Sequence, residues 1–77
     1  MATRLRFTYD READTLHIDR VPPYAEQESE ELGDDVIARI NPTTSAIENL
    51  EILFFSSRLL ERNFLELPVT GELRVAE

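Results

Sequence analysis

Apolar and polar residues alternate along several short stretches of this 77-residue chain, and this pattern constrains its fold more than any other feature. A period of two is typical of a β-strand that buries one face and exposes the other. Leu5, Phe7 and Tyr9 alternate with polar neighbours, and so do Leu16 and Ile18. The stretches with this pattern are residues 4–9, 15–19, 36–40 and 49–54. The sequence therefore predicts at least four strands.

The segments between these strands have the composition of turns and sheet edges. Asp10 to Asp14 makes a five-residue linker, which suits an antiparallel hairpin. Val21-Pro22-Pro23 ends the second strand, because proline cannot donate to a strand ladder. Residues 26–32 are highly charged and form either an edge strand or a loop, before a turn at Gly33-Asp34. Residues 41–45 have loop composition.

The C-terminal part of the chain predicts one helix. The pair Ser56-Ser57 can cap its start, and Pro68 ends it. An apolar stripe at helical spacing comprises Leu59, Leu60, Phe64 and Leu67. Residues 69–77 are expected to be a mobile tail, although Leu73 and Val75 alternate and allow a short docked strand.

The predicted fold class is α+β, a small antiparallel β-meander of four or five strands with one C-terminal helix. Residues 1–68 are expected to form a single domain, and residues 69–77 the tail. The helix is expected to cover one face of the sheet and to bury Leu5 and Phe7 on that face. The residues expected to be buried are Leu16, Ile18, Val36, Ile40, Leu50 and Ile52.

The composition limits the classes of partner. Sixteen acidic residues and eight arginines, with no lysine, give a net charge of −8. Such a surface repels phosphate backbones and anionic headgroups, so we expect no nucleic acid and no membrane partner. A basic protein is the natural complement, and the alternative is that the charge only maintains solubility. The absence of cysteine excludes disulfides and thiolate metal sites. No apolar signal segment follows Met1, which predicts a cytoplasmic location.

Three segments resemble a known bacterial family. They are residues 9–18, which read YDREADTLHI, residues 35–40, which read DVIARI, and residues 49–53, which read NLEIL and are followed by Ser56. This order resembles the family called domain of unknown function 2283 (DUF2283) over residues 5–60. The chain departs from the family pattern at His17, where an aromatic residue is usual, at Asn49, where glycine is usual, and in the turn at 41–45. The resemblance implies a small β-meander ending in a helix, with no assigned activity and, in some members, a likeness to antitoxins of toxin–antitoxin pairs.

The acidic turn does not fit a calcium loop. Asp10, Glu12 and Asp14 have the spacing of the first EF-hand ligands. The sixth loop position is Thr15 instead of glycine, and the twelfth is Val21 instead of a bidentate glutamate. We therefore expect these carboxylates to accept hydrogen bonds from turn amides and to remain solvated.

The remaining candidates are also weak as catalytic or metal-binding groups. His17 is the only histidine and should point away from the core, toward solvent or a dimer contact. Ser56 and Ser57 lack a nucleophile elbow. The carboxylates of an acidic cluster are adjacent, which suits a charged edge or a partner-facing strip better than a glycosidase pair. That cluster comprises Glu26, Glu28, Glu30, Glu31, Asp34 and Asp35. No catalytic residue, cofactor or metal ligand is expected. Arg4 and Arg6 share a strand face and could pair with this cluster in the same chain or in a second copy.

Three functional hypotheses follow. The first is a non-catalytic, antitoxin-like interaction module that binds a basic protein. The alternatives are a homo-oligomeric structural protein without ligand and a carboxylate-dependent enzyme. We also expect a homodimer, because the sheet face opposite the helix should expose the apolar residues Ile37, Leu53 and Phe55. In the competing monomer, the tail folds back and covers them with Leu73 and Val75.

Overall fold

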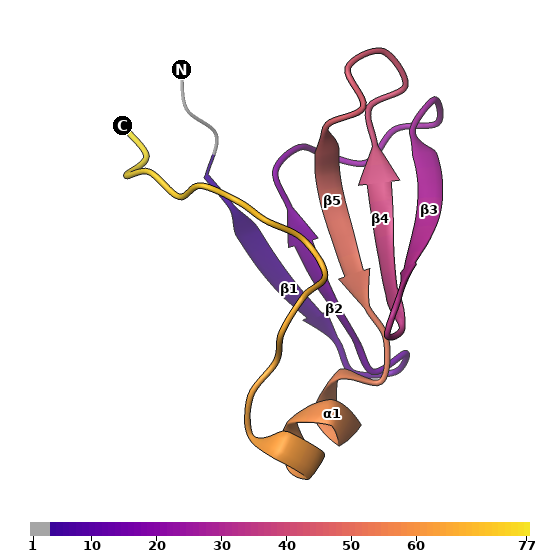
Figure 1. Ribbon diagram of the computed structural model, residues 1–77, viewed down its shortest axis with the longest axis vertical. Coiled ribbons are helices and arrows are strands. Elements are labelled where there is room, and N and C mark those ends of the chain that lie inside the picture. The colour runs from indigo at the N-terminus through magenta and orange to yellow at the C-terminus, as the bar shows by residue number, and fades with distance from the viewer. Residues whose placement is uncertain (1–3) are drawn as a thin grey trace.

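The computed structural model describes residues 4–77 and has five strands in one antiparallel sheet, followed by one helix (Figure 1). The strands are β1 (Arg6–Asp10), β2 (Thr15–Asp19), β3 (Glu28–Gly33), β4 (Val36–Ile40) and β5 (Ile47–Ile52), and the helix is α1 (Phe55–Arg62). The predicted α+β class, with an antiparallel sheet and a C-terminal helix, is confirmed. The charged segment before Gly33 is an edge strand, one of its two predicted alternatives.

The strand order is β1-β2-β5-β4-β3. A β1–β2 hairpin therefore lies beside a three-stranded meander, and β5 returns to pair with β2. The turn between β3 and β4 is Asp34-Asp35, with φ angles of 52° and 59°. A two-residue type I′ turn requires positive φ at both central positions, which aspartate tolerates. The predicted turn at Gly33-Asp34 is thus displaced by one residue.

The core lies on one face of the sheet, around its central strands. Ile52 on β5 is opposite Leu16 on β2 and Val36 on β4. Ile52 and Val36 are fully buried, and Ala38 and Leu50 are also buried. Three of the six residues predicted to be buried are therefore buried. The other three, Leu16, Ile18 and Ile40, are half-buried and pack against this cluster.

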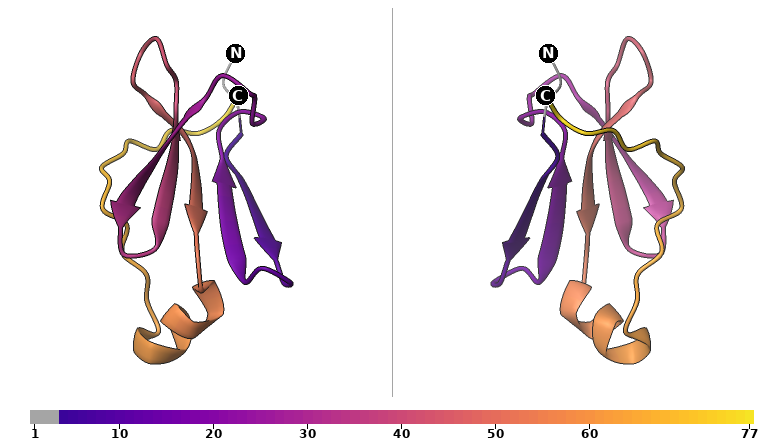
Figure 2. Two further views of the ribbon diagram at one scale, coloured as in Figure 1. Left: turned by 90° about the vertical axis from the view of Figure 1, so that its right-hand side faces the viewer. Right: turned by 90° about the vertical axis from the view of Figure 1, so that its left-hand side faces the viewer.

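Only the first residue of the helix, Phe55, packs against the core, so the helix does not cover the core face as predicted. α1 has no buried residue, and Leu60 is 88% exposed. Instead, the segment after the helix extends along the core face, where Leu65, Leu67 and Val69 pack against the core cluster. Figure 2 shows this segment running along one side of the sheet.

The placement of Leu67 on a helix was wrong, because the helix ends five residues earlier. Asn63 adopts a left-handed conformation with φ 51°, and its amide donates to the Leu59 carbonyl at 2.8 Å. Asparagine tolerates this conformation and commonly terminates helices. The chain then continues as an extended segment, in which Pro68 is acceptable because no helix hydrogen bond is required there. Val69, one residue beyond the predicted boundary at 68, packs against the core cluster.

The opposite face of the sheet is mainly polar. His17 and Ile37 are the cross-strand neighbours of Glu51 on this face. Arg39 forms an ion pair with Glu51 at 3.0 Å. The assumption that Phe55 lies on this face was wrong. Phe55 belongs to α1 and packs against the core, and its ring centroid is 5.7 Å from that of Tyr9.

The remaining expectations concern the burial of Leu5 and Phe7 and the covering of apolar residues by the C-terminal tail. Leu5 and Phe7 are not covered and are 40% and 59% exposed. The tail does fold back, but Leu73 and Val75 are 87% and 89% exposed and do not cover the patch predicted for them. Ile37 and Leu53 are half-buried, and the dimer interface predicted from them stays a prediction.

Candidate functional site

The most highly charged surface of the molecule follows the outer edge of the sheet. β3 pairs only with β4, and Glu28, Glu30 and Glu31 on it are all exposed. Glu30 is opposite Ala38 and therefore projects to the core face, whereas Glu31 is opposite Ile37 and projects to the other face. The carboxylates thus flank the strand on both sides. They do not converge on a cleft, as an acid–base pair would require.

The acidic edge continues into the turn and toward the helix. We use the name acidic edge for Glu28, Glu30, Glu31, Asp34 and Asp35, all of which are exposed. Below it lies a shallow depression of about 400 Å³, which Glu61 and Glu66 also line. Arg58 partly neutralises this region and donates a hydrogen bond to the Asp34 carbonyl oxygen. Glu26, the remaining member of the predicted cluster, lies in the linker before β3.

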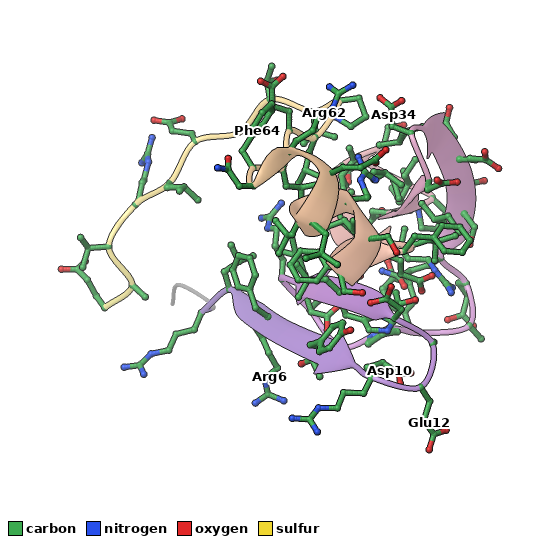
Figure 3. The ribbon with its side chains drawn as sticks, turned by 90° about the horizontal axis from the view of Figure 1, so that it is seen from below. Arg6, Asp10, Glu12, Asp34, Arg62 and Phe64 are labelled. Atoms are coloured by element: carbon green, nitrogen blue, oxygen red, sulfur yellow. The ribbon has the colours of Figure 1, made fainter. Side chains whose placement is uncertain are left out.

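The two edges of the sheet carry different charges. Figure 3 shows Asp34 and Arg62 on one side of the molecule and Arg6, Asp10 and Glu12 on the other. β1 and β3 are the outermost strands. Arg6 therefore cannot pair with the acidic edge of its own chain, and only the pairing with a second copy stays a prediction.

Asp14 joins the β1–β2 turn to the start of the helix. Its Oδ1 accepts hydrogen bonds from the Tyr9 hydroxyl at 2.6 Å and from the Ser56 amide at 3.0 Å. Its Oδ2 accepts from the Ser56 hydroxyl at 2.9 Å, and its carbonyl oxygen accepts from the Phe55 amide at 2.9 Å. The hydrogen bonds from Tyr9 and from the Ser56 amide lower the pKa of the Asp14 carboxyl group. The same contact with Asp14 raises the pKa of Tyr9.

This contact replaces the helix cap expected at Ser56-Ser57. The capping position is Phe54, which has φ 54° and makes no side-chain cap hydrogen bond. The first-turn amides instead receive a carboxylate from another element, and negative charge there is favourable. Asp10 behaves as expected, because its Oδ1 accepts from the amides of Glu12 and Ala13 at 3.1 and 3.3 Å.

A second polar network surrounds Asn49, which is only 3% exposed. Its Nδ2 donates to the Val21 carbonyl oxygen at 2.7 Å and to Asp19 Oδ1 at 2.8 Å. Its Oδ1 accepts from Gln27 Nε2 at 2.6 Å. Asn49 thus binds both ends of the linker that joins β2 to β3. The only signal for this role in the sequence was an amide side chain within a predicted strand.

Glu48 extends this network at the same end of the sheet. Its Oε1 accepts hydrogen bonds from the Tyr24 hydroxyl at 2.5 Å and from Gln27 Nε2 at 3.1 Å, and its Oε2 accepts from Asn41 at 3.2 Å. The hydrogen bonds from Tyr24 and Gln27 lower the pKa of Glu48, and the bond to Glu48 raises the pKa of Tyr24 to about 12. These residues hold the linker against β5.

The side chains that were weak candidates for catalysis or metal binding lie apart. His17 is on the face opposite the core, as expected, with Thr8 and Glu51 as its cross-strand neighbours. The Ser56 hydroxyl donates to Asp14. Within residues 4–77, no group of three or more histidine, cysteine or acidic side chains has a geometry that could hold a metal ion. No helix in this range is long and apolar enough to span a bilayer.

Residues 6–56, more than half of the chain, match the family model described as Protein of unknown function (DUF2283). The chain belongs to the DUF2283 family. No significant match is found among the curated proteins or among the solved structures.

The structure gives a physical reason for the DUF2283-like pattern in this chain. Tyr9 and Asp14 lie in the first segment that carries the resemblance, and Ser56 follows Asp14 by 42 residues, yet the three side chains form one hydrogen-bonded cluster. Asn49 stands where the family pattern usually has glycine, and here it is the centre of the linker network. The DUF2283 pattern in this chain therefore includes residues that hold its elements together.

Proposed function

We propose that this DUF2283 protein is a non-catalytic interaction module whose acidic edge binds a basic, extended segment of a partner protein. The observation that carries the proposal is the exposed strand β3, which has a free outer side and carboxylates on both faces. The outer backbone groups of an edge strand can pair with an added strand. In an antitoxin-like role, this edge would cover a basic segment of the paired protein.

The charge arrangement supports a basic partner. Glu28 and Glu30 project to one face of the edge, and Glu31 projects to the other. A strand added beside β3 would therefore meet carboxylates on both of its faces. The net charge of −8 would also accelerate encounter with a cationic protein.

Contacts of the candidate reactive groups support a non-catalytic role. Asp14 and Ser56 bind each other, and Asp10 binds the amides of its own turn. A nucleophile or general base must be free to contact a substrate. In this chain these side chains hold the hairpin and the helix in place.

The test is titration of the labelled protein with a synthetic peptide of alternating arginine and valine, followed by NMR. We expect amide shifts along β3 and saturable binding that weakens with salt. The triple variant Glu28→Gln/Glu30→Gln/Glu31→Gln should lose binding. The matched control Glu12→Gln/Glu72→Gln/Glu77→Gln removes the same charge elsewhere and should retain it. Equal loss in both variants, or shifts that avoid β3, would contradict the proposal.

A further inference from the structure

The two edge strands of the sheet differ in how they are protected from pairing. β3 carries three glutamates and has a register irregularity between Glu31 and Gly33, both of which discourage pairing with an identical edge. β1 has neither feature. All five of its residues are exposed, and it pairs with β2 in an unbroken register from Arg6 to Asp10. Proline, glycine and a net charge are all absent from it.

The sequence of β1 is complementary to itself in the antiparallel direction. It reads Arg6-Phe7-Thr8-Tyr9-Asp10. A two-fold axis at Thr8 places Arg6 opposite Asp10 of a second copy, Phe7 opposite Tyr9, and Thr8 opposite Thr8. Opposite charges, aromatic pairs and threonine pairs are the cross-strand combinations that stabilise antiparallel sheets.

We propose that β1 is a homodimerisation edge, where two copies pair about a two-fold axis at Thr8 and form one continuous ten-stranded sheet. The axis is perpendicular to the sheet, so the core face of one copy continues into the core face of the other. This constraint allows only registers that pair residues of the same face. An axis at Phe7 is also allowed, but it places Arg6 opposite threonine. The axis at Thr8 matches every residue of β1 with another residue of β1.

Both faces of β1 have side chains suited to this pairing. On the core face, Phe7 and Tyr9 are 59% and 42% exposed, and pairing would bury part of each ring against the other copy. On the other face, Arg6 and Asp10 project to the same side of β1, away from the helix (Figure 3). Asp10 uses Oδ1 for its turn amides, so Oδ2 is placed to accept from a guanidinium group.

The local charge explains why a second copy can occupy this edge. Each chain has a net charge of −8, so most surfaces of two copies repel each other. β1 contains one arginine and one aspartate and is therefore neutral. The acidic edge lies on the far side of each copy and stays free in the dimer. The inference is independent of the proposed function, because it concerns a different strand.

The first experiment measures mass in solution by light scattering at micromolar concentration. We expect twice the chain mass of 8.9 kDa. Thr8→Lys should raise the dissociation constant roughly tenfold or more, because two like charges face each other across the axis. Thr43→Lys adds the same charge in the exposed β4–β5 loop and should leave the dimer intact. A monomeric parent chain, or a Thr8→Lys variant that dimerises as well as the parent, overturns the proposal.

The second experiment uses the absence of cysteine in the chain, which makes single-cysteine variants unambiguous. Thr8→Cys should form a disulfide-linked dimer on mild oxidation, because the two introduced side chains lie opposite each other. Glu30→Cys, in the middle of the other edge, should not. Cross-linking through Phe7→Cys in preference to Thr8→Cys overturns the proposed register. Circular dichroism spectra that match the parent confirm that each variant is folded.

Discussion

Replacing Ile52 with alanine tests whether the sheet is held together at the position where β2, β5 and β4 meet. Ile52 is fully buried and lies between Leu16 and Val36 on the neighbouring strands. The substitution removes three carbons, worth about 2.4 kcal/mol at about 0.8 kcal/mol each, before any cavity is counted. With the cavity term, the expected loss in the free energy of unfolding is about 3–4 kcal/mol.

This loss is large for so small a domain. A chain of this length typically has an unfolding free energy of about 4–12 kcal/mol, so Ile52→Ala should shift the urea midpoint strongly or abolish the transition. The matched control is Leu60→Ala, which also removes three carbons but from a side chain that is 88% exposed. Its effect should be below about 0.5 kcal/mol. A loss below about 1 kcal/mol for Ile52→Ala would show that this side chain is not at the centre of the core.

Two further predictions concern the Asp14 contact and the C-terminal segment. Contacts lower the pKa values of Asp14 and Glu48 below their ordinary values of 3.8 and 4.5. The ionised carboxylates therefore stabilise the folded chain fully when the pH is above these ordinary values, and this stabilisation is lost as the pH falls through the lowered pKa values. Asp14→Asn should therefore flatten the fall in thermal midpoint between about pH 5 and pH 2, whereas Glu12→Gln in the same turn should not. The same dependence of the thermal midpoint on pH in the parent and in both variants would refute this. Truncation after residue 70 should leave the thermal midpoint unchanged. Truncation after residue 62 should unfold the chain, because it removes Leu65, Leu67 and Val69 from the core face. Equal midpoints for the two truncated chains would show that residues 63–70 contribute nothing to stability.

Four of the five strands could be predicted from their period of two, whereas the charged sequence of β3 has no such period and fits an edge strand and a loop equally well. The end of the helix could not be placed, because Leu67 fits both a helical stripe and an extended segment. Two local signals favoured the extended segment, namely Asn63 as a helix-terminating residue and the alternation of Leu65, Leu67 and Val69. Both are weaker than the apolar stripe that suggested a longer helix.

The contacts of Asp14 could not be predicted, because they depend on tertiary structure. Asp14 and Ser56 are 42 residues apart, and no local pattern specifies that they meet. The left-handed conformation of Phe54 could not be predicted from the sequence either, since bulky aromatic residues rarely adopt it. The resemblance to DUF2283 includes Tyr9, Asp14 and Ser56, and the structure shows that they share one cluster.

The pairing of β2 with β5 has a consequence for how the chain folds. The hairpin of β1 and β2 and the meander of β3, β4 and β5 each pair strands that are consecutive in the sequence. The pairing of β2 with β5, by contrast, brings Leu16 next to Ile52, which is far along the chain. Closing that loop costs conformational entropy before any burial compensates it. The docking of hairpin against meander is therefore the expected barrier to folding. Until it is crossed, both β2 and β5 present unpaired edges, and aggregation competes with folding at this step.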